Sequence, residues 1–255
     1  RMRKAYKIGN ELFKTDGLTN SIANTYNLYK SNNTVYIVSA YSQGNMLSCN
    51  AINSLKEGIS IVKSAAIVIQ KIHNKGYLYL DIKPDNIFTF KETSDIVRFF
   101  DFDTLIPVSI TERNKGYYDY QISYTKGYAP LEQREGNKKR IGKYSDVYGI
   151  GALLFYLIFN QAPSALDCDN DADYDFSSLT KFPVRTYQDK LFFKLKEFFH
   201  HTLAHYYLDR FQDMEEVIEK LDELISLSDT SIPFIYGSRI SEPVFIVGRD
   251  KENDY

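Results

Sequence analysis

The chain is poor in cysteine: only Cys49 and Cys168 occur among 255 residues, and they stand far apart in the sequence. This scarcity argues against a disulfide framework or a zinc site and favours a reducing, cytoplasmic compartment. Neither sign of charge is in excess, since the net charge is −2 at pH 7, so we expect neither nucleic acid nor an anionic membrane as a partner. The longest strongly apolar run, 147–159, is shorter than the roughly 20 residues that span a bilayer. We expect that run to be a buried helix, and we expect no signal peptide.

The segment from Tyr79 to Phe88 places an acid (Asp81), a cation (Lys83) and an amide (Asn86) close together along the chain. Such a set suits phosphoryl transfer, in which the acid accepts the proton of an attacking hydroxyl, the amide holds a metal ion and the lysine offsets phosphoryl charge. The same composition is also typical of a surface turn.

A second acid favours the functional interpretation. The apolar run 98–105 predicts a strand that ends at Asp101. Two strands that end near Asn86 and Asp101 can bring an amide and a carboxylate onto one magnesium ion, which prefers oxygen ligands.

Five motifs in this order resemble the protein kinase family, in its eukaryotic-type serine/threonine class and bacterial style. The family's His-Arg-Asp-x-Lys-Pro-x-Asn corresponds to 79–86, its Asp-Phe-Gly to 101–103, and its Ala-Pro-Glu to 129–132. The apolar stretch from Ser145 is similar to the buried central helix of the larger lobe. Arg210 stands where the family keeps the partner of the glutamate in the third motif.

The resemblance implies an α+β, two-lobed fold over about residues 1–227. Residues 1–42 would be the remainder of a small β lobe that lacks its first strands, and 43–227 a mainly helical large lobe. Residues 228–255 are interpreted as a linker. Its end, 245–252, looks like the opening of an ATPase-type domain, and an ordinary polar tail explains it equally well.

The resemblance also implies an enzyme that transfers the γ-phosphate of ATP, with Mg²⁺, to serine or threonine of a protein substrate. Asp81 would be the catalytic base, Lys83 would steady the γ-phosphate, and Asn86 and Asp101 would hold the metal. Thr125 would bridge Asp81 and Lys83 and help to select a hydroxyl.

Further positions in the nucleotide site follow from the same resemblance. Ser39 would be the gatekeeper, and backbone groups near Ala40 and Tyr41 would bind the adenine edge. Glu11, on a predicted amphipathic helix, would pair with the phosphate-gripping lysine, although Asn10 or a surface role for Glu11 fits the spacing as well.

Three more residues would support the site. Glu132 and Arg210 would form an ion pair that braces the substrate-binding segment. Asp146 would bond the backbone of the catalytic loop from below.

Several departures from the family pattern keep other functions open. Leu80 replaces the arginine that receives an activation-loop phosphate, which implies activity without that phosphorylation. Asp103 replaces a glycine, and would either weaken a conformational switch or add a metal contact. The glycine-rich loop and the lysine strand, which would precede Glu11, are not found in the sequence, and we interpret this either as an amino-terminal truncation or as a degenerate kinase. The alternatives are therefore a pseudokinase that acts as a regulatory module, and a small-molecule kinase of the aminoglycoside type.

Local patterns predict the remaining elements. We expect strands over 22–29 and 34–41, a hinge over 41–45, a helix over 55–73 that stops at Gly76, a functional loop over 103–125, a loop over 160–183, and two helices between 187 and 227.

Three further signals are interpreted as structural. The run 136–144 fails as a Walker loop, because its glycine spacing is wrong and Tyr144 replaces the required hydroxyl; a basic edge or a substrate-docking patch explains it better. His200, His201 and His205 lack the pattern of a metalloprotease. The acidic run 167–175 lacks the glycine and glutamate of an EF-hand loop.

Overall fold

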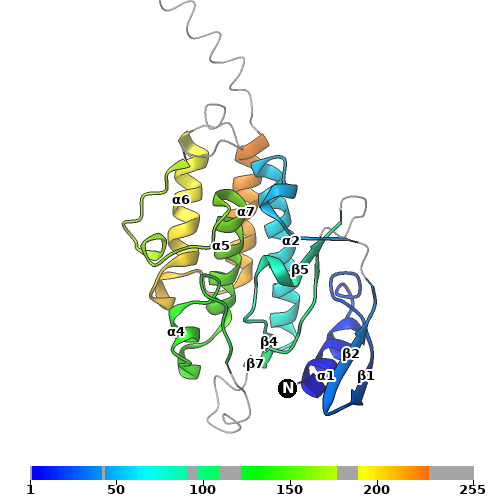
Figure 1. The fold of residues 1–255 in the computed structure, drawn as a ribbon. Helices are drawn as coiled ribbons and strands as arrows, with labels where there is room; N and C mark the ends of the chain where they lie inside the picture. Colours follow the sequence, from blue (N-terminus) through cyan, green and yellow to red (C-terminus); the bar gives the residue numbers. More distant parts are fainter. Residues whose placement is uncertain (1, 42–43, 91–96, 109–121, 177–188, 230–255) are drawn as a thin grey trace, which may run out of the picture.

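The computed structural model describes residues 2–41, 44–90, 97–108, 122–176 and 189–229. The large lobe contains α2 (Leu55–Asn74), the short α4 (Leu131–Arg134), α5 (Lys143–Phe159), α6 (Asp189–Leu203) and α7 (Met214–Asp229). Figure 1 shows α2 and α7 side by side, with α5 between them and α6. This arrangement confirms the expected mainly helical lobe.

Helix α2 has defined signals at both ends. The Ser54 side chain accepts a hydrogen bond from the Glu57 backbone N–H at 3.1 Å, and the Glu57 carboxylate accepts one from the Asn53 N–H at 2.7 Å. This reciprocal cap satisfies backbone donors that a helix start leaves unpaired. Gly76, just beyond the end, has φ +80. The predicted helix over 55–73 and its glycine stop are confirmed.

Helix α5 is apolar on all sides and is almost entirely buried, as expected for a core helix. A Cβ at Gly149 would lie 2.9 Å from the Cβ of Ile82, and a Cβ at Gly151 would collide with Thr202. The two glycines therefore let α5 approach both the 79–86 loop and α6.

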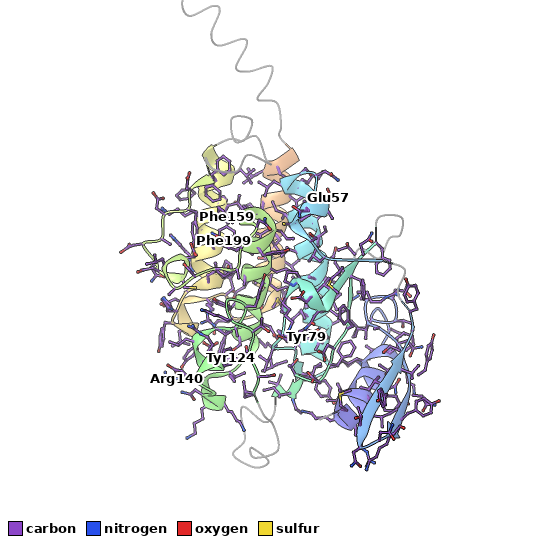
Figure 2. The ribbon with its side chains drawn as sticks, in the orientation of Figure 1. Glu57, Tyr79, Tyr124, Arg140, Phe159 and Phe199 are labelled. Carbon is purple, nitrogen blue, oxygen red and sulfur yellow. The ribbon has the colours of Figure 1, made fainter. Side chains whose placement is uncertain are left out.

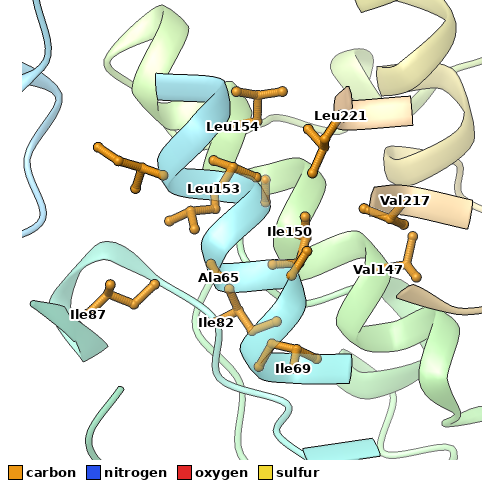
Figure 3. Close-up of a cluster of buried hydrophobic side chains, with 14 of the residues drawn as sticks. Ala65, Ile69, Ile82, Ile87, Val147, Ile150, Leu153, Leu154, Val217 and Leu221 are labelled. Carbon is orange, nitrogen blue, oxygen red and sulfur yellow. The ribbon is translucent and has the colours of Figure 1, made fainter. Parts of the chain in front are cut away.

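Most of the buried hydrophobic side chains in the described residues belong to one continuous cluster, and a second, small cluster surrounds Leu80. Figure 3 shows the centre of the large cluster, where side chains of three helices meet: Ala65 and Ile69 of α2, Val147, Ile150, Leu153 and Leu154 of α5, and Val217 and Leu221 of α7. Ile82 and Ile87 enter the same core from either side of the predicted site residues 83–86. Each buried aliphatic side chain of this size contributes about 1.5–3 kcal/mol, so the core fixes the backbone of that loop.

The small lobe contains α1 (Met2–Phe13) and a hairpin of β1 (Thr25–Ser31) and β2 (Thr34–Ser39). The hairpin was predicted, but its limits were wrong: β1 spans Thr25–Ser31 rather than 22–29, and β2 ends at Ser39 rather than Tyr41. Ile22 instead forms a parallel bridge with Phe99 of the large lobe. Long-range pairing of this kind cannot be read from local alternation.

Short strands surround the predicted site. β3 (Asn45–Met46), β5 (Ile87–Thr89) and β6 (Val97–Phe99) form one sheet in that order, and β4 (Tyr77–Leu78) pairs with β7 (Ile106–Pro107). The expected hinge over 41–45 thus ends in β3, and a Cβ at Gly44 would lie 2.7 Å from the Thr89 carbonyl oxygen. The expected loop over 103–125 includes β7. Residues 42–43 and 109–121 lie outside the described part.

At the C-terminal side, α7 continues to Asp229, two residues beyond the predicted boundary at 227. The linker and the ATPase-like segment 245–252 lie outside the described residues. The boundary between 1–42 and 43–227 stays a prediction, although Ile8, Leu12 and Ile22 belong to the same core cluster as the large-lobe helices. Among the helices described, none combines the length and apolarity needed to cross a membrane.

Candidate active site

The loop that carries the first motif is held from below by Asp146 of α5. Its buried carboxylate accepts hydrogen bonds from the backbone N–H groups of Tyr79 (2.9 Å) and Leu80 (2.7 Å), and it lies 2.7 Å from Nε2 of His73. Both side chains of this His–Asp pair are almost fully buried. Asp146 is therefore where the resemblance placed it, whereas His73 was not foreseen.

Tyr79 ties the loop to the segment around the second motif. Its ring is fully buried and packs edge-on against Phe99 and Phe102, and its hydroxyl donates to the Phe100 carbonyl at 2.6 Å. The Thr104 hydroxyl donates in turn to the Tyr79 carbonyl at 2.8 Å. Burial, followed by the nearby Asp81 carboxylate, raises the Tyr79 pKa well above its usual value, so the phenol stays protonated and able to donate.

The side chains of Asp81, Lys83, Asn86 and Thr125 form one hydrogen-bonded group. Thr125 Oγ1 donates to Asp81 Oδ1 at 2.9 Å, and Lys83 Nζ lies 2.8 Å from Asp81 Oδ2 and 3.1 Å from Thr125 Oγ1. The structure thus places the Thr125 hydroxyl between Asp81 and Lys83. The Asn86 amide N–H₂ donates to the Asp81 carbonyl (2.9 Å) and to Asp81 Oδ2 (2.8 Å), so its oxygen points away from Asp81.

Asn86 and Asp101 are brought together by the pairing of β5 with β6. Ile87 lies opposite Phe99, and the Phe100 N–H donates to the Asn86 carbonyl at 3.2 Å. Asp101 follows directly, in the left-handed region with φ +61, which is strained for a residue with a side chain and recurs at functional sites. Leu80, beside Asp81, has φ +64.

The residues present fit a magnesium ion. The free amide oxygen of Asn86 and the Asp101 carboxylate are oxygen donors, and Mg²⁺ is usually bound by one or two protein side chains with substrate phosphates and waters. Partial burial, followed by the neighbouring Asp103 and then Asp81, raises the Asp101 pKa. The raised pKa means that burial and the neighbouring carboxylates disfavour the ionised form of Asp101. A bound cation would stabilise that form.

The raised Asp101 pKa gives a stability prediction. A carboxyl group whose folded-state pKa is raised stabilises the fold below its unfolded-state pKa and loses that contribution as pH rises through the folded-state value. At neutral pH the ionised Asp101 is therefore a stability cost, and asparagine tolerates its positive φ. We expect Asp101→Asn to raise the melting temperature of the metal-free protein by a few degrees at pH 7 and by less at pH 4. If Asp101→Asn lowers the melting temperature equally at pH 7 and at pH 4, this account is contradicted.

A cavity of about 380 Å³ lies beside Asp101, between α1, the hairpin and the second motif. Ser39 lines it together with Thr25 and Ile37. The Ala40 N–H donates to the Asn24 carbonyl at 2.7 Å, so this group is engaged within the hairpin, and Tyr41 is 89% exposed.

Glu11 does not line this cavity. It is exposed at the other end of α1, where its carboxylate accepts a hydrogen bond from the Tyr77 hydroxyl at 3.3 Å. Asn10 accepts a hydrogen bond from the buried Thr25, a cavity residue, at 3.1 Å. The structure therefore brings Asn10, rather than Glu11, next to the cavity, because the two positions face different sides of the helix.

The third motif is fixed by a buried ion pair. Arg210 forms a bidentate contact with Glu132, with distances of 2.8 and 3.2 Å, and Ser145 Oγ donates to the same carboxylate at 2.8 Å. Gln133, which sequence reasoning missed, donates to the carbonyls of Leu80 (2.7 Å) and Ser123 (2.8 Å). Helix α4 is thereby joined to the first motif and to the segment that ends in Thr125.

Leu80 joins a small apolar cluster. It packs with Leu78, Ile106 and Ile141, and with the partly buried Ile122. Where the family pattern has an arginine, this chain therefore holds the surrounding segments by apolar contact.

The three clustered histidines contact backbone groups. His200, His201 and His205 each place a ring nitrogen 3.1 Å from a backbone carbonyl. No group of three histidine, cysteine or acidic side chains in the described ranges is arranged to bind a metal. Cys49 and Cys168 are buried and form no disulfide within the described residues.

Comparisons with known proteins identify the family. Residues 10–221 match the model of the protein kinase domain. Over 150 residues the chain is 25% identical to serine/threonine-protein kinase D of Synechocystis sp., which covers 58% of the chain and 29% of that protein. Over 155 residues it is 27% identical to serine/threonine-protein kinase PknA of Nostoc sp., which covers 58% of the chain and 27% of that protein. The chain thus spans less than a third of the length of these relatives.

This chain belongs to the protein kinase domain family. The α+β kinase fold expected from the five motifs is confirmed.

Proposed function

We propose that the chain transfers the γ-phosphate of ATP to serine and threonine hydroxyls of protein substrates. The contact of the Asp81 carboxylate with both Thr125 and Lys83 carries this proposal, because it combines a proton acceptor and a cation beside a residue of the substrate segment. Asp81 orients and deprotonates the attacking hydroxyl, and Lys83 stabilises charge on the phosphoryl group.

Asn86 and Asp101 would hold the magnesium ion, which would neutralise charge on the ATP phosphates. Positioning and electrostatics supply most of such catalysis. The buried supports, Asp146 beneath the loop and Glu132–Arg210 beneath the substrate segment, favour this proposal because they hold the reacting groups in one geometry.

A pseudokinase is the second candidate, and two observations favour it. Glu11 lies outside the cavity beside Asp101, and Asp103 adds a carboxylate there. In that case the chain would keep the fold as a binding module without transferring phosphate.

The test is incubation of the protein with Mg²⁺ and γ-labelled ATP against serine, threonine and tyrosine peptides, with sugars and aminoglycosides in parallel. We expect label on serine and threonine. Binding of Mg-ATP without transfer would favour the pseudokinase, and label on the small molecules alone would overturn a protein substrate.

A further inference from the structure

A short basic loop lies beside the substrate segment. Residues 134–143, here called the basic loop, contain five basic residues and one acidic residue, although the chain as a whole has a net charge of −2. Arg134, Lys139 and Arg140 are exposed, and Figure 2 shows Arg140 at the same end of the molecule as Tyr124, which precedes Thr125.

Both ends of the basic loop are fixed. Before it, the Gln133 amide bonds the carbonyls of Leu80 and Ser123. Within it, Ile141 is 1% exposed and packs in the cluster of Leu80, and the Gly142 N–H donates to Ser145 Oγ at 3.2 Å. A charged loop held in this way loses little conformational entropy when it binds a partner.

Four of the five basic residues of the loop have no ion-pair partner within the described part of the chain. Lysines outside the loop do form ion pairs with described residues, such as Lys63 with Asp222. By contrast, Arg134, Lys139, Arg140 and Lys143 form none with a described residue. Clustered like charges repel one another, so the fold carries a cost here that a bound anion would relieve.

A hollow of about 350 Å³ lies within this surface. Lys139, Lys143, Tyr144 and Gln212 line it. Two carboxylates close to Gln212 in the sequence accept backbone hydrogen bonds: Asp213 from the N–H groups of Glu215 and Glu216, and Glu216 from the Gln212 N–H. The hollow can therefore receive a carboxylate between two ammonium groups.

The position of the loop indicates which anion it meets. Leu80, bonded by Gln133, is adjacent to Asp81, and Ser123 lies two residues before Thr125, which bonds Asp81. A peptide with its hydroxyl at Asp81 advances at most about 3.3–3.6 Å per residue, so residues near the hydroxyl would come within reach of the loop.

We propose that the basic loop binds acidic side chains that flank the accepting serine or threonine of the protein substrate. This rests on the proposed function, and it adds a substrate class: acidic serine/threonine segments. A nucleic acid or an anionic membrane fits less well, because the chain as a whole is net acidic.

The test compares two variants of the protein. Lys139→Glu/Arg140→Glu reverses two charges of the loop. Lys7→Glu/Lys190→Glu reverses two exposed lysines on α1 and α6 as a matched control. Each is assayed with a serine peptide flanked by aspartates, and with the same peptide flanked by lysines. Binding is measured separately by fluorescence anisotropy of forms in which alanine replaces the serine.

For the loop variant we expect the KM of the acidic peptide to rise about tenfold with kcat within about twofold, because uniform binding is lost. The preference between the two peptides should shift toward the lysine peptide, and the control should behave as wild type. Higher salt should reduce the wild-type preference.

The proposal is overturned if wild type binds both peptides equally, if both variants change alike, or if the loop variant loses only RNA or anionic-vesicle binding. A protein that transfers phosphate to no peptide, yet binds the acidic alanine peptide selectively through the loop, would refute the proposed function while supporting this inference.

Discussion

Replacement of Asp81 by alanine is expected to lower phosphate transfer by about 10²–10⁴-fold, the contribution of a positioned general base. Its carboxylate receives hydrogen bonds from Thr125, Lys83 and Asn86, so the variant loses both the proton acceptor and the group that orders its neighbours. The measurement is initial-rate transfer from labelled ATP, with circular dichroism to verify folding.

Asp16→Ala, at an exposed acid outside the site, is the matched control and should retain the wild-type rate. If the Asp81 variant retains more than a tenth of the wild-type rate, Asp81 is not the base, and the assignment of the whole hydrogen-bonded group fails.

Loss of Arg210 is expected to have the largest effect on stability. The Arg210 and Glu132 side chains are 0% and 3% exposed. Removal of one partner of a buried ion pair costs about 3–5 kcal/mol, because the remaining charge is left uncompensated. We therefore expect Arg210→Met to lower the free energy of unfolding by this amount, measured by urea denaturation with an unchanged slope.

A second substitution separates charge from packing. Glu132→Gln added to Arg210→Met should recover part of the loss, because no unpaired carboxylate remains. Lys63→Met, which breaks the more exposed pair with Asp222, should cost about 1 kcal/mol or less. Equal costs for Arg210→Met and Lys63→Met would contradict a buried brace.

The prediction of helices and site residues from the sequence was most accurate where the local pattern and the motifs agree. The buried helix around 147–159 and the helix over 55–73 follow from apolar periodicity and from end signals such as Ser54 and Gly76, and the structure contains both. The positions of Thr125 and Arg210 came from motif order alone, since no local pattern links residues 44 or 78 positions apart to their partners.

What the sequence did not reveal depends on tertiary contact. His73 and Gln133 occupy ordinary helical positions, and only the folded chain shows that they meet Asp146 and the Leu80 carbonyl. Glu11 was preferred over Asn10 because the resemblance places a glutamate on this helix, whereas the direction of each side chain from α1 is set by packing in the folded chain. The Leu80 cluster was missed for the same reason, because its members come from segments far apart in the chain.

The central claim is that Asn86 and Asp101 share one magnesium ion beside Asp81. The most direct measurement is a crystal structure of the protein with Mg²⁺ and a non-hydrolysable ATP analogue. We predict a single ion bound by the Asn86 amide oxygen and the Asp101 carboxylate, each at about 2.0–2.1 Å, with the terminal phosphate facing Asp81. A nucleotide bound elsewhere, or an ion that neither side chain contacts, would contradict the account.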